Sequence, residues 1–235
     1  MMVGLPLVVL VIAADPTFCD EQPSKGTPLS RGRPSKGSVD GAVALTEGPA
    51  VRVLPKRHRE RCLSWATPRL VAALERAGRE VQKAVPNSPP LGVGNLGRPR
   101  GGSLAPYSHS HQAGRDGDLA FYALDGKRPV ALDDLERFDR SLTSPDGKLR
   151  FDVARNWALV AALISDDSIQ LKWLFVSAPL KEALLAHARN VGAAPEIIAV
   201  AERVLHQPSD APPHDDHFHV RIRCTANERD EGCVD

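Results

Sequence analysis

Residues 214–224, with the sequence HDDHFHVRIRC, carry the pattern that decides the fold. Successive side chains of a strand point to opposite faces, so His217, His219 and Arg221 would share one face. The other face is apolar and consists of Phe218, Val220, Ile222 and Cys224. Because an apolar face of this kind packs on a hydrophobic core, we expect the two imidazoles to point outward from a rigid strand.

A second segment, residues 108–122, reads SHSHQAGRDGDLAFY and holds further candidate ligands. Gly114 and Gly117 permit a tight, irregular turn, and Asp118 then opens an apolar run that indicates a strand. We therefore expect Asp118 at the mouth of that strand. Asp116 is expected to order the turn rather than to bind a metal.

Five of the eight histidines fall in these two segments, whereas His58, His187 and His206 are scattered along the chain. Two imidazoles with one carboxylate form a ligand set typical of catalytic zinc, which keeps a fourth position open for water. A cation held in this way lowers the pKa of its bound water to about 7 and polarises a carbonyl group. The pattern therefore indicates amide hydrolysis without a covalent nucleophile, with the remaining histidines as candidates for proton transfer.

The two segments also resemble a known group of enzymes. The spacing His111-x6-Asp118, followed roughly 100 residues later by His217-Phe218-His219, is similar to that of the lysostaphin, D-Ala-D-Ala metallopeptidase and hedgehog zinc peptidases. Within this group, both segments resemble the penicillin-insensitive murein endopeptidases. The likeness runs from about Arg52 to Cys233.

This resemblance implies specific roles for the clustered residues. His111, Asp118 and His219 would bind Zn²⁺. His217 would be the general base or proton shuttle, and His214 would stabilise the developing oxyanion. The implied substrate is the D-alanyl to meso-diaminopimelyl crosslink between peptidoglycan stem peptides.

Four residues near these motifs are harder to assign. Gly117 stands where a branched aliphatic residue is expected, and glycine loosens the beginning of a strand. His109 is either an active-site residue or a polar loop residue. Asp215 and Asp216 either orient neighbouring histidines or solvate their loop.

Two alternative functions remain open from the sequence. The same scaffold would serve a D-Ala-D-Ala dipeptidase or carboxypeptidase, with specificity set by loops such as Asp125 to Arg150. The chain would otherwise be a zinc-containing cell-wall binding module without turnover, because ligand residues alone do not show an open coordination position. The N, N, O ligand set also accepts divalent ions other than zinc.

Composition is ordinary for a globular enzyme and excludes one class of partner. The 235 residues are 42% hydrophobic and 25% charged, which is enough for one sizeable core. A net charge of +1 without a basic stripe gives no reason to expect nucleic acid. We expect a single zinc peptidase domain over residues 42–235.

The first 41 residues are expected to lie outside that domain. Residues 1–14 resemble a signal peptide, because the apolar stretch Val3 to Ala14 is too short to cross a bilayer. The protein is thus expected in the periplasm without a stable membrane anchor. Residues 15–41 contain two copies of Pro-Ser-Lys-Gly in a polar background and are expected to form a disordered linker.

Four cysteines in an exported chain allow three pairings. Cys224 and Cys233 are nearest in sequence, and the family resemblance implies that they pair behind the HxH strand. Cys19 with Cys62 is then the remaining choice, although either could be free.

Hydrophobic periodicity predicts the remaining elements. Helices are expected over residues 68–85, 154–165, 179–191 and 195–205. Strands are expected over residues 91–96, 118–124, 169–176 and 217–224. Long helical connections between strands indicate an α+β fold, and the resemblance implies a small central antiparallel sheet that is flanked by helices and carries the zinc site. The tryptophans Trp65, Trp157 and Trp173 are expected in the core, with Trp65 alternatively lining the cleft.

Overall fold

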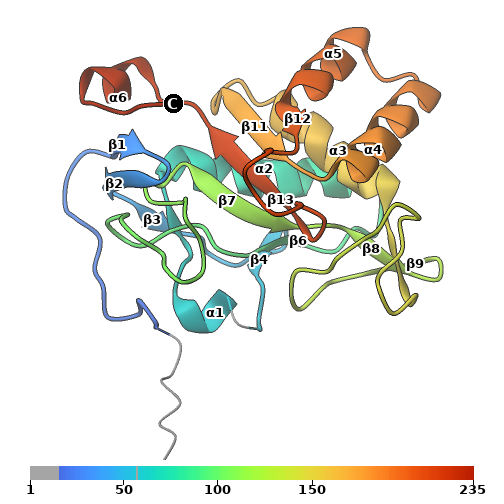
Figure 1. The fold of residues 1–235 in the computed structure, drawn as a ribbon, viewed down its shortest axis with the longest axis horizontal. Helices are drawn as coiled ribbons and strands as arrows, with labels where there is room; N and C mark the ends of the chain where they lie inside the picture. The colour runs from blue at the N-terminus through green and yellow to red at the C-terminus, as the bar shows by residue number, and fades with distance from the viewer. Residues whose placement is uncertain (1–15, 57) are drawn as a thin grey trace, which may run out of the picture.

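The computed structural model describes residues 16–56 and 58–235, and a six-stranded sheet lies at its centre (Figure 1). The expected signal peptide, residues 1–14, lies outside the described residues. The strand order across the sheet is β12-β11-β13-β7-β6-β4. In that order the strands are Leu205–His206, Leu171–Phe175, His217–Ile222, Asp116–Ala120, Leu91–Val93 and Val51–Val53.

The sheet is mixed, which corrects the expectation of a small antiparallel sheet. Its four central strands pair antiparallel, but β12 joins β11 and β4 joins β6 in parallel. Parallel neighbours need a long crossover connection, usually a helical one. The chain supplies such connections, since α2 lies between β4 and β6 while α4 and α5 lie between β11 and β12. The mixed α+β class itself is confirmed.

The long helices lie on one face of the sheet. Figure 1 shows α2 behind strands β7 and β13, and α3, α4 and α5 in the upper right of the view. Phe218, Val220 and Ile222 of β13 are fully buried and share one core with residues of α2, α3, α4 and α5, as the alternating pattern predicts. The helices are α1 His58–Arg61, α2 Pro68–Ala84, α3 Val153–Ile164, α4 Ala178–Asn190, α5 Pro195–Val204 and α6 Ala226–Asp230. The opposite face of the sheet, which carries His217 and His219, is called the site face below.

The strand expected over residues 118–124 is split in two. Strand β7 ends at Ala120, and β8 (Ala123–Asp125) starts a separate sheet in the order β10-β8-β9, with β9 at Arg128–Val130 and β10 at Leu149–Phe151. The break occurs where Asn156 of α3 binds the backbone of Tyr122, because its side-chain oxygen accepts the Tyr122 N–H at 3.0 Å and its amide donates to the Tyr122 carbonyl at 2.8 Å.

Part of the expected disordered linker is ordered, which corrects that prediction. Strands β1 (Leu29–Arg33) and β2 (Lys36–Asp40) form a hairpin whose turn is Pro34 and Ser35, in the second Pro-Ser-Lys-Gly copy. The hairpin is held by the rest of the chain, since the Ser30 hydroxyl donates to the Ala113 carbonyl at 2.8 Å and Val39 is 1% exposed. The prediction from local composition did not anticipate this hairpin, because residues far along the chain supply its buried contacts.

Two disulfides are present: the Cys224–Cys233 pair that the resemblance implies, and the Cys19–Cys62 pair, for which the sequence left free cysteines as the alternative. Cys224 bonds Cys233 behind β13, and Cys19 bonds Cys62. The latter lies near a small two-stranded sheet of β3 (Val43–Ala44) and β5 (Trp65–Ala66). Trp157 is buried in the core as predicted, but Trp173 is only partly buried and lies outside the core cluster.

Candidate metal centre

Strands β7 and β13 are adjacent, and their register brings the two sequence segments together. His219 pairs with Asp118, and Arg221 pairs with Asp116. Directly opposed residues of an antiparallel pair place their side chains on the same face. His111 joins them from the loop before β7, where it adopts a positive φ of 67°. A strained backbone angle of this kind at a non-glycine residue is often found at functional sites.

One carboxylate oxygen lies at the centre of the cluster. Asp118 Oδ1 is 3.1 Å from His111 Nε2, 3.3 Å from His217 Nε2 and 3.5 Å from His219 Nδ1. His111 is 1% exposed, and Asp118 and His219 are 6% exposed each. Four polar side chains are thus gathered in a space with little access to water.

Hydrogen bonds define which ring atom of His111 is free to bind an ion. Its Nδ1 is 2.7 Å from the Leu96 carbonyl oxygen, which can only accept, so Nδ1 carries the proton. In the neutral ring, Nε2 then points a lone pair at Asp118. Burial lowers the pKa of His111, but the charge and hydrogen bond of Asp118, the Asp116 charge and the Leu96 carbonyl together outweigh burial and raise that pKa. A cation between these two acceptors would balance the carboxylate without protonating the ring.

His219 lies beside a partly buried ion pair on the same face, and its Nε2 has no hydrogen-bond partner among the described residues. Arg221 donates from Nε and Nη2 to the two carboxylate oxygens of Asp116, at 2.7 and 3.0 Å. Asp116 Oδ2 lies 3.7 Å from His219 Nε2 and also accepts the His111 backbone N–H at 3.1 Å. Asp116 therefore orders the turn, as predicted, and it also faces His219. This second contact was missed, although the period of two along β7 puts Asp116 and Asp118 on one face.

His217 and His214 border the cluster in different electrostatic states. Asp216 accepts from His217 Nδ1 at 2.5 Å. Burial lowers the pKa of His217, but the Asp118 and Asp216 carboxylates outweigh it and raise that pKa to about 10. Burial and the neighbouring His217 and His219 lower the pKa of His214 to about 4, so its ring is neutral at pH 7. His214 Nδ1 is buried and has no hydrogen-bond partner among the described residues.

Two overlapping sets of ligand atoms could hold an ion. One consists of His111, Asp118 and His219, and the other of His214, His217 and His219; within each set the ligand atoms lie within 4.8 Å of one another. The first set is fully buried and includes a carboxylate, whose negative charge favours a bound cation. It is also the set predicted from the sequence.

The backbone of Asp118 is held firmly from behind. Its N–H donates to the Asn95 carbonyl at 2.9 Å, and its own carbonyl accepts the Gly94 N–H at 2.8 Å. Gly117, the departure noted in the sequence, packs so closely that a Cβ there would lie 2.6 Å from Leu96 Cδ2. A larger residue at position 117 would require the Leu96 side chain to shift, and the backbone hydrogen bonds of Asp118 hold its position without one.

His58, which seemed scattered in the sequence, supports the same region. It is 4% exposed, and its ring atoms lie 3.0 Å from Asn95 Oδ1 and 3.2 Å from Asp134 Oδ1. No local motif signals this role, because the three residues come from distant segments. His109, in contrast, is exposed and belongs to neither ligand set.

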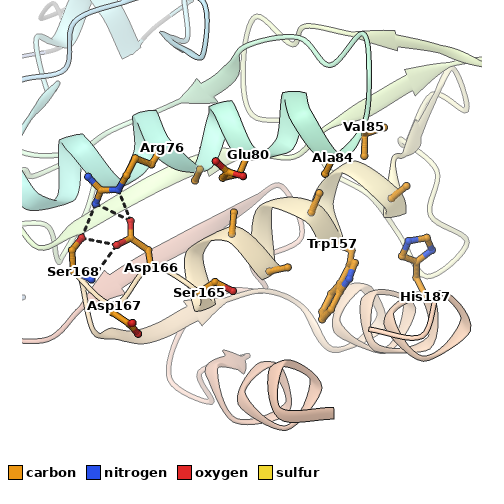
Figure 2. Close-up of a pocket in the computed structure, with 15 residues that line it drawn as sticks. Arg76, Glu80, Ala84, Val85, Trp157, Ser165, Asp166, Asp167, Ser168 and His187 are labelled. Carbon is orange, nitrogen blue, oxygen red and sulfur yellow. Dashed lines mark hydrogen bonds and ion pairs between the residues drawn. The ribbon is translucent and has the colours of Figure 1, made fainter. Parts of the chain in front are cut away.

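A separate groove lies elsewhere. It has a volume of about 820 Å³ and runs between α2 and α3, where Trp157 and Glu80 are among its lining residues (Figure 2). These helices pack on the core face of the sheet, so the groove is on the opposite side from His217 and His219. It contains none of the clustered ligands.

A comparison with known protein families agrees with this geometry. The family model described as penicillin-insensitive murein endopeptidase matches residues 30–235. The chain belongs to this family. No curated protein matches the chain. Membership of the penicillin-insensitive murein endopeptidases identifies the chain as a peptidase of the cell wall and implies peptidoglycan as its substrate.

Further properties fit a member of the murein endopeptidases. Two disulfides and a cell-wall substrate suggest an exported protein. Within residues 16–56 and 58–235, no helix has both the length and the apolar character needed to cross a membrane.

Proposed function

We propose that this chain is a zinc-dependent endopeptidase of the periplasm that hydrolyses D-alanyl to meso-diaminopimelyl crosslinks between peptidoglycan stem peptides. The observation that carries the proposal is the approach of His111 Nε2 and His219 Nδ1 to one oxygen of Asp118, at 3.1 and 3.5 Å. Three buried acceptors that face one another require a cation or a proton between them.

The donor set suits Zn²⁺ with an open position. His111, Asp118 and His219 supply two nitrogens and one oxygen, the usual number of protein ligands at a catalytic zinc. Asp116 stands behind His219, in the manner of the carboxylates that orient metal-binding imidazoles. When bound, zinc polarises the scissile carbonyl and lowers the pKa of the attacking water.

The remaining side chains have separate tasks in the proposed reaction. His217 accepts the proton of the attacking water at Nε2 and later passes it to the leaving amine, while Asp216 holds its Nδ1. A cation at Asp118 would compensate part of the charge that raises the pKa of His217, so the neutral base becomes accessible. His214, neutral at pH 7, supplies an N–H to the developing oxyanion.

The proposal is tested by metal analysis of the purified protein together with digestion of intact peptidoglycan sacculi. We expect about one zinc per chain and a loss of crosslinked muropeptide dimers that a chelator abolishes. The variant His217→Ala should keep the metal but lose at least about 100-fold of the cleavage rate. His109→Ala is the matched control and should cleave like the wild type, because His109 is exposed and outside the cluster.

Each alternative has its own result in this experiment. Release of a terminal D-alanine without loss of dimers would show a carboxypeptidase. Bound zinc with no product from any muropeptide would show a binding module. A protein that binds no metal would overturn the assignment of His111, Asp118 and His219.

A further inference from the structure

A row of aromatic rings extends the site face from the metal centre to the edge of the sheet. Phe175 pairs with His219 in register, and Trp173 pairs with Arg221, so both aromatic side chains share the face of the metal ligands. In the parallel edge pair, Phe175 is opposite His206. We call Phe175, Trp173 and His206 the aromatic row.

The rings of the row contact one another and the site. Phe175 lies 5.1 Å from the His219 ring and 5.5 Å from the His214 ring, between centroids. Trp173 stacks on Phe175 at 6.3 Å with an interplanar angle of 23°, and it lies 5.2 Å from His206. With ring separations of 5.1 and 6.3 Å, Trp173 is no more than about 11 Å from the His219 ring.

The outer part of this row is open to solvent. Trp173 is partly exposed and His206 is exposed, and neither belongs to the hydrophobic core. Their strand neighbours Leu174 and Leu205 do belong to it. A large aromatic side chain on the polar face of a sheet does not contribute to packing of the hydrophobic core. Exposed aromatic surface that is continuous with a catalytic centre is typical of a binding site.

The chemistry of the row suits a sugar ring. The face of an indole is electron-rich, and the axial C–H bonds of a pyranose form a flat, weakly positive apolar surface that stacks on it. In the proposed substrate, a stem peptide joins the sugar to the scissile bond, and an extended chain spans about 3.3–3.6 Å per residue. A few extended residues are therefore enough to reach from the His219 ring to Trp173.

We propose that Trp173, with His206 beside it, is a subsite that stacks an N-acetylated sugar of the glycan strand while the attached stem peptide lies across the metal centre. The inference rests on the proposed function and deepens it, because the enzyme would then recognise the glycan as well as the peptide. Trp173 is a specificity residue here and takes no part in bond cleavage.

The test compares two crosslinked substrates that differ only in the sugar. One is a dimer of disaccharide-bearing stem peptides, and the other is the same peptide dimer after an amidase has removed the sugars. We expect Trp173→Leu to raise KM for the first dimer roughly three- to tenfold, the range of one aromatic contact, and to leave KM for the sugar-free dimer unchanged. Trp173→Phe keeps an aromatic face and should retain most of the affinity for the first dimer.

A binding measurement separates this proposal from the proposed function. The peptide-free disaccharide of N-acetylglucosamine and N-acetylmuramic acid should quench the fluorescence of the wild type but not of Trp173→Leu. Trp157→Phe is the matched control, since Trp157 lies in α3 and lines the groove of Figure 2 on the other side of the sheet, and it should respond like the wild type. Thermal melts should agree within a few degrees for all the variants.

The outcomes are distinct. The glycan subsite would be overturned if Trp173→Leu raised KM equally for both dimers. It would also be overturned if the disaccharide did not bind to the wild type. If the wild type cleaves neither dimer, the proposed function fails instead, and the disaccharide titration still decides whether Trp173 binds sugar.

Discussion

Asp118 approaches three imidazoles at one carboxylate oxygen, and two of these rings are held by hydrogen bonds from the other side. His111 is held by the Leu96 carbonyl, His217 by Asp216, and His219 faces Asp116. Fixed orientation matters because side chains that are already held in place lose little conformational entropy when the ion or substrate binds. The pKa of Asp118 reflects this environment: burial raises it, but His111 and His217 lower it well below the usual value.

Asp216→Asn should move the pH dependence of cleavage. His217 must be neutral to accept a proton, so the acid limb of the pH profile follows its pKa. The Asp216 carboxylate helps to raise that pKa, and an amide would not. We therefore expect the acid limb of kcat/KM to shift by about one unit toward lower pH.

Asp215→Asn is the control for this measurement. Asp215 faces Arg137 at 3.7 Å, and no contact with His217 is described for it, so the acid limb should remain in place. An unchanged limb in Asp216→Asn would argue against His217 as the base.

Helix α2 shows how secondary structure supports the site from the core side. It buries Leu70, Leu74, Ala77 and Val81 at helical spacing, as predicted from the sequence. Gly78 lies on the same buried side, where the helix approaches the backbone of residue 50 just before strand β4. This contact sets how closely α2 packs against the edge of the sheet.

Gly78→Ala should destabilise the protein, although helix propensity alone predicts the opposite. Alanine favours a helix by about 1 kcal/mol over glycine. A Cβ at residue 78, however, would lie 2.2 Å from the backbone oxygen of Ala50, which cannot move without shifting the chain. We expect a net loss of about 1–3 kcal/mol in the free energy of unfolding, measured by urea denaturation.

Gly48→Ala provides the comparison, because no atom lies within 4 Å of a Cβ at that position. Its free energy of unfolding should stay within about 0.5 kcal/mol of the wild type. A stabilised Gly78→Ala would show that α2 can move away from residue 50.

Arg115 joins the two ends of the described chain behind the metal centre. Its side chain is fully buried and donates to the Ser30 hydroxyl, the Ile222 carbonyl and the Val234 carbonyl at 2.9 to 3.1 Å. Hairpin β1–β2, strand β13 and the C-terminal segment therefore meet at one guanidinium. The Cys224–Cys233 disulfide holds this segment directly after β13.

Replacing both Cys224 and Cys233 by serine should destabilise the whole fold. The bond closes a short loop, for which chain entropy predicts a loss of about 3 kcal/mol. Release of the C-terminal segment also removes hydrogen-bond partners of buried Arg115. The decrease in the free energy of unfolding, measured by urea denaturation, should therefore be at least as large as the value from chain entropy.

The Cys19 and Cys62 double serine variant is a useful reference. Its disulfide spans 43 residues, so entropy alone predicts the larger loss, about 4 kcal/mol. If both variants have the same urea midpoint of unfolding as the wild type, the disulfides do not contribute to stability.

Local pattern in the chain was enough to predict several features. The alternation in HFHVRI predicted the core and site faces of β13, and the sequence placed every bound of α2, α3, α4 and α5 within one residue. The motif residues His111, Asp118 and His219 were predicted to converge, and their ligand atoms do lie together. These features depend on neighbours in sequence or on a spacing that the family shares.

Tertiary structure alone decided the rest. Several features depend on partners far along the chain. They are the order of residues 29–40, the parallel edge strands, the buried position of His58, the Arg221–Asp116 ion pair and the place of Trp173 on the site face. A local sequence window carries the preference of each segment, but not the identity of the surface that will bury it. Burial and hydrogen-bond satisfaction between distant segments are settled only when the chain has folded.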